Sequence, residues 1–204
     1  MKGKILLALV LGLLLAAGAW IFIKANGENY ALQEFFLRSR YARYDFLIQQ
    51  AATKHRVSPS LIKAVIWRET RFVPDSVGQD GERGLMQITE AAAKDWVRIE
   101  KVGTFVPTDL FDPKTNIEVG TWYLARALQR WTAKDNPIPF ALAEYNAGRT
   151  HVRRWESQSA PGAEFGADDL EATMDFPTTK SYVSAIEKRY REFRKRGEFG
   201  EDSK

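Results

Sequence analysis

One glutamate lies in a sequence setting that suits acid–base chemistry. Ser58 and Pro59 predict a helix start, as N-cap and first helical residue, and apolar periodicity continues to about Thr70. At about 100° per residue, three apolar side chains share the helix face of Glu69: Ile62, Val65 and Ile66. A carboxyl group among such side chains loses hydration, which favours its protonated form and raises its pKa. The pattern makes Glu69 a candidate general acid.

This helix alone leaves a plainer role open for the glutamate. A carboxylate at the end of a helix is more commonly an ordinary charge at the edge of the core, here paired with Arg68 or Arg71. The segments that follow along the chain favour the chemical role.

Five short segments occur in a characteristic order and spacing. They are Glu69-Thr70-x-Phe72; Gly84-Leu85-Met86-Gln87-Ile88; Phe111-Asp112-Pro113 with Asn116, Gly120 and Tyr123-Leu124; Tyr145-Asn146-Ala147-Gly148; and Tyr182-Val183. Each segment alone is weak evidence. Together, from about Ala51 to Ile186, they resemble the soluble lytic transglycosylase family.

The resemblance implies a mostly α, lysozyme-like fold, also similar to goose-type lysozyme, with Glu69 as the essential catalytic residue. It implies these substrate-binding residues: Thr70, Met86, Gln87, Tyr145, Asn146 and Tyr182. The two amides would hydrogen-bond sugar N-acetyl and hydroxyl groups. Met86 and Tyr145 would line the cleft, Tyr182 would place its phenol near Glu69, and Thr70 would keep the hydroxyl of the family's usual serine.

The substrate-binding residues other than Thr70 also have a structural alternative. Met86 is equally suited to fill the core, the two amides to cap helices or turns, and the tyrosines to pack as aromatics. The chain also departs from the family pattern. Thr89 stands where methionine is common, and Thr178-Thr179-Lys180 stands where Glu-Thr-Arg is common, so the family's charge contact near the cleft is not carried over to this chain.

The sequence offers only one well-placed carboxylate, whereas glycosidases commonly use two. We interpret Asp75, Asp80 and Glu82 as solvated loop acids. The shortage favours a single-acid mechanism on peptidoglycan glycan strands. Glu69 protonates the bond between N-acetylmuramic acid and N-acetylglucosamine, then acts as base on the muramyl 6-hydroxyl, which closes a 1,6-anhydro ring. This scheme uses no metal or organic cofactor. A hydrolytic muramidase and a noncatalytic peptidoglycan-binding module remain alternatives.

The elements expected to position these residues are helices. Besides the helix with Glu69, helical patterns cover one or two segments within Tyr30–His55, and Ala91–Val97, Thr115–Arg130, Pro139–Tyr145, Val152–Ser157 and Thr179–Lys195. Loops are expected at Pro74–Gly84 and Ser157–Pro177. The sequence therefore predicts an all-α domain with a loop-built cleft.

The N-terminus predicts export and attachment to a membrane. Lys2 and Lys4 precede an uncharged run, Ile5–Ile23, that would span about 28 Å as a helix, enough to cross a bilayer. The lysines place the N-terminus in the cytoplasm and the domain outside, in the cell envelope. A signal peptide cleaved before Trp20 is the alternative. We expect an anchor at 1–24, a stem helix at 25–43, the catalytic domain at 44–195 and a flexible charged tail at 196–204.

Composition excludes several other classes of function. The chain has no cysteine, so thiol nucleophiles, disulfides and cysteine-ligated zinc are ruled out. His55 and His151 lie far apart and form no metal-binding pattern. The net charge of +4 suits anionic surroundings in general. Nucleic acid is not expected as a partner, because the densest basic cluster, Lys188–Arg196, has the spacing of a solvated helix face.

Overall fold

A computed structural model describes residues 12–14, 17–18, 39–158 and 164–200 of the chain. The chain divides into two compact units, Met1–Arg43 and Tyr44–Lys204. In the first unit, residues 12–14, 17–18 and 39–42 are helical. Most of the predicted anchor and stem lies outside the described residues. Within the described ranges, we find no helix with the length and apolar character that a membrane crossing requires.

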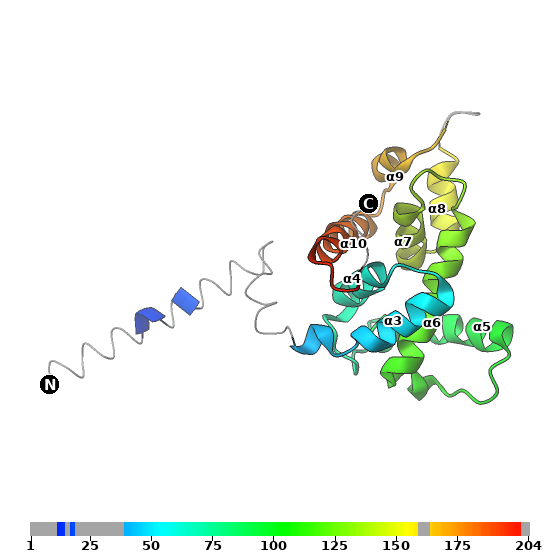
Figure 1. Ribbon diagram of the computed structural model, residues 1–204. Helices are drawn as coiled ribbons and strands as arrows, with labels where there is room; N and C mark the ends of the chain where they lie inside the picture. The colour runs from blue at the N-terminus through cyan, green and yellow to red at the C-terminus, as the bar shows by residue number, and fades with distance from the viewer. Residues whose placement is uncertain (1–11, 15–16, 19–38, 159–163, 201–204) are drawn as a thin grey trace, which may run out of the picture. The chain divides into compact units, whose positions relative to one another are not determined.

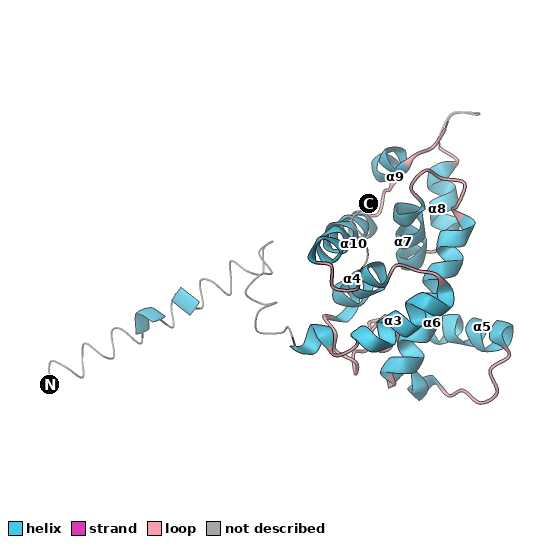
Figure 2. Cartoon of the chain, viewed as in Figure 1, coloured by secondary structure: helices cyan, strands magenta, loops and turns pink. Residues whose placement is uncertain are grey.

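The second unit is built from helices joined by loops and turns (Figures 1 and 2). In chain order they are α3 (Asp45–His55), α4 (Pro59–Thr70), α5 (Glu90–Glu100), the 3-10 helix η1 (Pro107–Phe111), α6 (Pro113–Arg130), α7 (Pro137–Ala147), α8 (Arg149–Glu156), α9 (Ala167–Thr173) and α10 (Pro177–Arg196). No β-strand occurs among the described residues, where Arg83 forms isolated bridges with Val77 and Ile88. The predicted mostly α domain is confirmed.

The helix starts follow the signals in the sequence. Ser58 caps α4, and its side chain accepts a hydrogen bond from the backbone N–H of Leu61. Asp112 caps α6 in the same way through Thr115, and Asn136 caps α7. Proline stands in the first turn of each of these helices and of α10, where its missing N–H removes no hydrogen bond.

The predicted loop Ser157–Pro177 is wrong in part, because it contains α9. This helix has only seven residues, too few to show a clear apolar period. Its first turn is fixed by the Asp169 carboxylate, which accepts the N–H of Gly166 at 2.9 Å, and by Leu170, which is fully buried. Packing of α9 against α7 and α8 therefore stabilises a helix that its sequence did not predict.

Helix α4 is the buried centre of this arrangement. Every residue from Pro59 to Trp67 is buried, and α3 and α10 pack against it. In turn α10 packs on α7, and α7 packs on α6. A helix that is enclosed in this way holds its last turn firmly, so Glu69, near the end of α4, has a fixed position close to α10 and α7.

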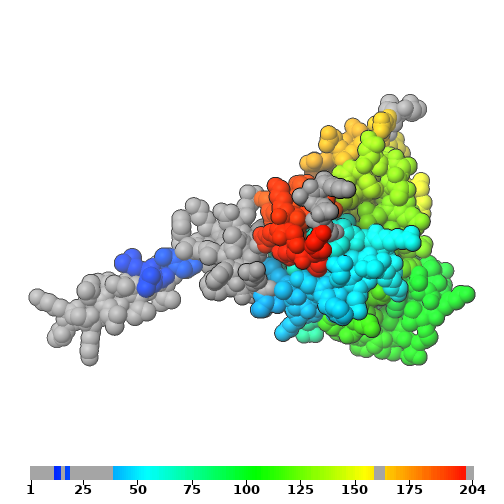
Figure 3. Space-filling model, in the orientation of Figure 1, coloured from blue at the N-terminus to red at the C-terminus, as the bar shows by residue number. Residues whose placement is uncertain are grey.

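A buried lysine joins both ends of this unit to α4. Lys63 is 2% exposed and forms ion pairs with Asp45 on α3 at 2.7 Å and with Glu198 at 2.6 Å. Figure 3 shows the C-terminal part of the chain, in red, lying against the blue-to-cyan residues that include α3. Residues 197–200 of the predicted flexible tail are therefore held in place through Glu198, whereas 201–204 lie outside the described residues.

Candidate active site

The loop between α4 and α5 is held by one buried side chain, Asn116 of α6. Its Oδ1 accepts the N–H of Met86 at 2.8 Å, and its Nδ2 donates to the carbonyls of Arg83 and Leu110, both at 2.8 Å. Gly84 lies against the same amide with φ of 73°, and a Cβ there would come within 2.2 Å of the Leu110 carbonyl oxygen. This position therefore needs glycine, which explains the first residue of the Gly-Leu-Met-Gln segment.

Met86 lies in the core, the first of the two roles open to it, and not on the wall of a cleft. Its side chain is fully buried against Gly120, where an added Cβ would lie 2.5 Å from the Met86 sulfur. Gly120 follows Asn116 by one helical turn, so one face of α6 holds both the main chain and the side chain of the loop. The Met86 carbonyl accepts a hydrogen bond from the Tyr145 hydroxyl at 2.9 Å.

Glu69 has the electrostatic setting of a general acid. Its side chain is partly buried, next to the fully buried residues Ile62, Val65 and Ile66. Burial raises its pKa to about 7, although a hydrogen bond from Tyr182 and the charge of Arg68 lower it. A pKa close to neutrality suits a residue that must both give and take a proton.

Two tyrosines from different helices face this glutamate. Tyr182 of α10 donates to Glu69 Oε1 at 2.6 Å, so its phenol lies where the resemblance places it. Burial, followed by the nearby charge of Glu69, raises the pKa of both Tyr182 and Tyr145 well above 10. Both phenols therefore keep their protons and act as hydrogen-bond donors throughout the neutral range.

Asn146, at the end of α7, is exposed and is oriented by α10. Its Oδ1 accepts from the Thr179 hydroxyl at 2.7 Å. This contact uses the Asn146 oxygen and leaves the two N–H donors of its amino group available to a ligand. A neutral hydrogen bond from Thr179 thus connects α7 to α10 in the segment where the sequence departs from the family pattern.

Thr70 and Gln87 make internal hydrogen bonds in addition to any contact with a ligand. The Thr70 hydroxyl donates to the Leu85 carbonyl at 2.9 Å, which fastens the loop to the end of α4. Gln87 Nε2 donates to the carbonyls of Gly84 at 3.0 Å and Ser76 at 3.3 Å. These bonds fix the direction of the Gln87 amide and leave Oε1 as its free acceptor.

Glu82 is less exposed than the sequence analysis expected of a solvated loop acid. Asp75 and Asp80 are exposed, but Glu82 is partly buried, and its charge adds to the effect of burial in raising the pKa of Glu69. Its Oε2 accepts the Asp80 N–H at 3.1 Å and lies beside Gly78, where a Cβ would clash with it at 2.2 Å. The absence of a side chain at Gly78 gives this carboxylate its room, a signal that needs the folded loop to be recognised.

These residues bring together the end of α4, the loop after it, the end of α7 and the first half of α10. Residues 46–164 match the family model described as the transglycosylase SLT domain. The chain belongs to the transglycosylase SLT domain family. The resemblance inferred from the five segments is confirmed.

Relatives of this SLT-domain chain are lytic murein transglycosylases by name. The membrane-bound lytic murein transglycosylase F of Desulfosudis oleivorans is 38% identical over 118 residues, which are 56% of this chain and 24% of the relative. The soluble lytic murein transglycosylase of Escherichia coli K12 is 31% identical over 144 residues, 70% of this chain and 22% of the relative. The chain thus spans about a quarter of the length of these relatives.

A solved structure shares the fold of the SLT domain. The crystal structure of the 70-kDa soluble lytic transglycosylase from Escherichia coli superposes with a TM-score of 0.65 and 29% identity, over 74% of this chain and 24% of that one. The predicted lytic-transglycosylase type of fold is therefore confirmed for the second unit.

Proposed function

We propose that this SLT-domain protein is a lytic transglycosylase, which cleaves peptidoglycan between N-acetylmuramic acid and N-acetylglucosamine and leaves 1,6-anhydromuramic ends. The observation that carries the proposal is the Glu69 carboxyl, whose pKa burial raises to about 7 and whose Oε1 is held by Tyr182. The names of the relatives support this reaction class.

The hydrogen bond from Tyr182 supports Oε2 of Glu69 as the oxygen that delivers the proton. Because the phenol donates to Oε1 of Glu69, the proton of the neutral acid resides on Oε2. Oε2 protonates the glycosidic oxygen as the bond from the anomeric carbon breaks, and N-acetylglucosamine leaves with a hydroxyl group. Tyr182 then stabilises the new carboxylate, because a hydrogen bond to an ionised oxygen is stronger than one to a neutral oxygen.

The same carboxylate completes the reaction as a base. It accepts the proton of the muramyl 6-hydroxyl, and the 6-oxygen bonds to the anomeric carbon of its own sugar. One carbon–oxygen bond is broken and one is formed, and Glu69 regains its proton. Water does not enter the product, so this chemistry needs no residue to hold a nucleophilic water.

Substrate contacts in this proposal follow the free hydrogen-bonding groups. The Asn146 amino group donates to a sugar oxygen, and Gln87 Oε1 accepts from a hydroxyl or N-acetyl N–H. Tyr145 supplies one wall of the cleft, with Met86 acting through its backbone carbonyl. Thr70 acts on the loop as a positioning residue through Leu85.

A hydrolytic muramidase is the second candidate, and the carboxylate of Glu82 favours it. Its charge contributes to the raised pKa of Glu69, and activation of a water molecule requires a second carboxylate. Digestion of sacculi in oxygen-18 water separates the two reactions. A transglycosylase leaves unlabelled anhydro ends, whereas a muramidase leaves labelled reducing ends, and mainly labelled ends would replace our proposal by the second candidate.

Replacement of Glu69 by Gln tests whether the chain is an enzyme that uses this acid. The amide keeps the shape and the contact with Tyr182 but has no transferable proton, so we expect the release of muropeptides to fall by about two to four powers of ten. Glu171→Gln, on the exposed face of α9, is the matched control and should retain activity. Full activity of the Glu69 variant would mean that Glu69 is an ordinary charge at the edge of the core. A parent protein without activity would favour the noncatalytic peptidoglycan-binding module.

We also propose that the domain works in the cell envelope, outside a cytoplasmic membrane to which residues 5–23 attach it. The support is the uncharged run itself, with lysines on its leading side. An intact mass that begins at or near Met1, from protein that stays with membranes in high salt, is the expected result. A mature protein that begins at Trp20 would instead identify a cleaved signal peptide.

A further inference from the structure

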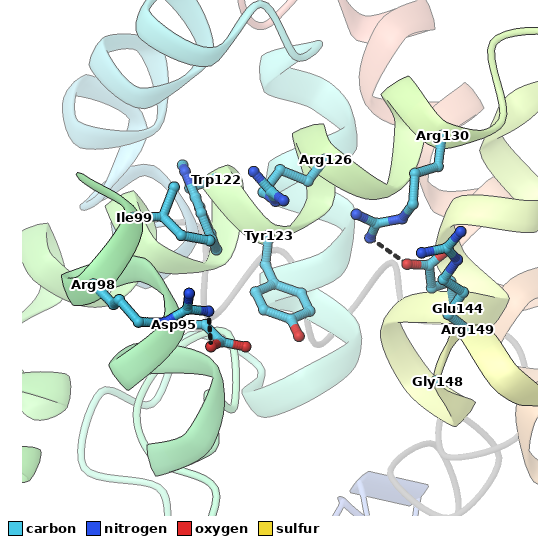
Figure 4. A pocket seen from close by; sticks show the side chains of 10 residues that line it. All are labelled: Asp95, Arg98, Ile99, Trp122, Tyr123, Arg126, Arg130, Glu144, Gly148 and Arg149. Carbon is cyan, nitrogen blue, oxygen red and sulfur yellow. Dashed lines mark hydrogen bonds and ion pairs between the residues drawn. The ribbon is translucent and has the colours of Figure 1, made fainter. Parts of the chain in front are cut away.

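A pocket rich in arginine lies next to the candidate active site. It has a volume of about 280 Å³ and is formed by α5, α6, the end of α7 and the start of α8 (Figure 4). Tyr123 connects the two places, because it lines the pocket and its ring meets that of Tyr145 edge to face, with centroids 6.5 Å apart. A chain that runs through the active site can therefore extend a branch into the pocket.

The charges that line the pocket are mainly positive. Four arginines face two carboxylates there: Arg98, Arg126, Arg130 and Arg149 against Asp95 and Glu144. Arg98 pairs with Asp95 at 2.8 Å, and Arg130 pairs with Glu144, so the internal carboxylates neutralise only these two arginines. Figure 4 shows the Tyr123 ring between the two ion pairs.

Arg126 and Arg149 supply the positive charge that the pocket does not neutralise. Both are exposed, and neither forms an ion pair within the described ranges of the chain. The guanidinium of Arg126 lies over the Trp122 ring, 4.8 Å from its centroid, which limits its directions. Each guanidinium offers a planar set of N–H donors that fits the two oxygens of a carboxylate.

We propose that this pocket binds a carboxylate of the peptide that branches from the muramyl sugar, with Arg126 and Arg149 as its ligands. This inference rests on the proposed function, which brings a glycan strand to Glu69. The muramyl lactyl group next to the cleaved bond carries a short peptide with several carboxylates. Ile99 in the same lining is exposed and provides apolar surface for a small side chain of such a peptide.

The test compares binding of two glycan oligomers, one with its peptides and one in which an amidase has left a lactyl carboxylate in place of each peptide. The full chain carrying Glu69→Gln is titrated with a soluble glycan oligomer that bears its peptides, and with the same oligomer after an amidase has removed them. We expect tighter binding of the peptide-bearing oligomer. Adding Arg126→Gln and Arg149→Gln should weaken that binding about tenfold at low salt and bring the two Kd values together. The preference should also shrink as salt rises.

Two further variants and a competition experiment serve as controls. Arg153→Gln, an exposed arginine of α8 outside the pocket, should leave both Kd values unchanged. Arg126→Lys with Arg149→Lys keeps the charge without the planar fork and should retain part of the preference. Free stem peptide should compete for the pocket better than inorganic phosphate does.

Equal binding of the two oligomers by the Glu69→Gln chain, with Arg126 and Arg149 intact, would overturn the inference. Two other results would overturn it as well. One is an equal loss of affinity for both oligomers when Arg126→Gln and Arg149→Gln are added, and the other is competition by phosphate as strong as competition by the peptide. Because binding is measured with Glu69 replaced, these outcomes are independent of whether the parent protein cleaves glycan.

Discussion

Removing the proposed catalytic acid should stabilise the protein at neutral pH. The pKa of Glu69 is about 7 in the folded chain, because burial disfavours the charged form, against an ordinary value of 4.5. The unfolded chain therefore ionises this group first. The neutral Glu69 carboxyl makes its full contribution to the free energy of unfolding below about pH 4.5, and this contribution is lost as pH rises through about 7.

The size of the effect follows from the difference between the two pKa values. A gap of about 2.5 units at 1.36 kcal/mol per unit gives about 3 kcal/mol above pH 7, and less than about 1 kcal/mol at pH 5. Solvent reaches part of the Glu69 side chain, so the expected effect is about 1 to 3 kcal/mol. Glutamine is neutral at every pH and can still accept the hydrogen bond of Tyr182, so Glu69→Gln escapes this loss.

Equilibrium urea unfolding at pH 5 and pH 8, followed by tryptophan fluorescence, measures the difference. We expect the free energy of unfolding of Glu69→Gln to exceed that of the parent protein at pH 8, and the excess to shrink at pH 5. Glu118→Gln is a control of opposite sign. The pKa of Glu118 is lowered overall, because burial raises it less than the hydrogen bonds from His55 and Lys54 lower it. The ionised carboxylate therefore stabilises the fold, and Glu118→Gln should lose stability at pH 8. The reasoning would be refuted if Glu69→Gln were no more stable than the parent protein at pH 8. It would also be refuted if the two free energies of unfolding differed by the same amount at pH 5 and pH 8.

Three other predictions concern the pH profile, the loop and the core. Cleavage of sacculi should fall as pH rises through about 7, and Glu82→Gln should move that midpoint to lower pH, because the charge of Glu82 contributes to the raised pKa of Glu69. An unmoved midpoint would remove Glu82 from the site. Gly120→Ala should cost about 1 to 3 kcal/mol in urea unfolding and reduce activity, since its Cβ would lie 2.5 Å from the buried Met86 sulfur; a neutral effect would mean that the loop yields easily. Lys63→Ala should lower the unfolding midpoint more than Lys63→Met does. Both variants leave Asp45 and Glu198 without their positive partner, but methionine still fills the buried space. Equal losses of stability would assign the whole effect to charge.

Much of the framework around the site could be predicted from the sequence because it depends on neighbours along the chain. The N-cap at Ser58, the proline after it and the apolar face next to Glu69 are local properties of one helix. The raised pKa of Glu69 follows from that face, since it depends on burial more than on any particular partner. The five family segments could likewise be recognised one after another.

The partners of these residues were decided only by the tertiary structure. Tyr182 lies 113 positions from Glu69 in the chain, and their contact exists because α10 packs along α4. The resemblance suggested this pair, but the directions of other side chains could not be inferred. Met86 points into the core because Gly120 leaves room there, and the Thr70 hydroxyl donates to the Leu85 carbonyl.

Polar side chains on loops are the least predictable part for a physical reason. A glutamate or an amide can bond several partners at similar free energy, and the fold chooses among them by the space and the backbone groups it brings close. The sequence predicts Glu82 to be a solvated acid. In the fold, Gly78 leaves room for its carboxylate to accept the Asp80 N–H, and the charge of Glu82 contributes to the raised pKa of Glu69. The sequence determined which helix carries the acid, and the packing of the loop decided which charges that acid meets.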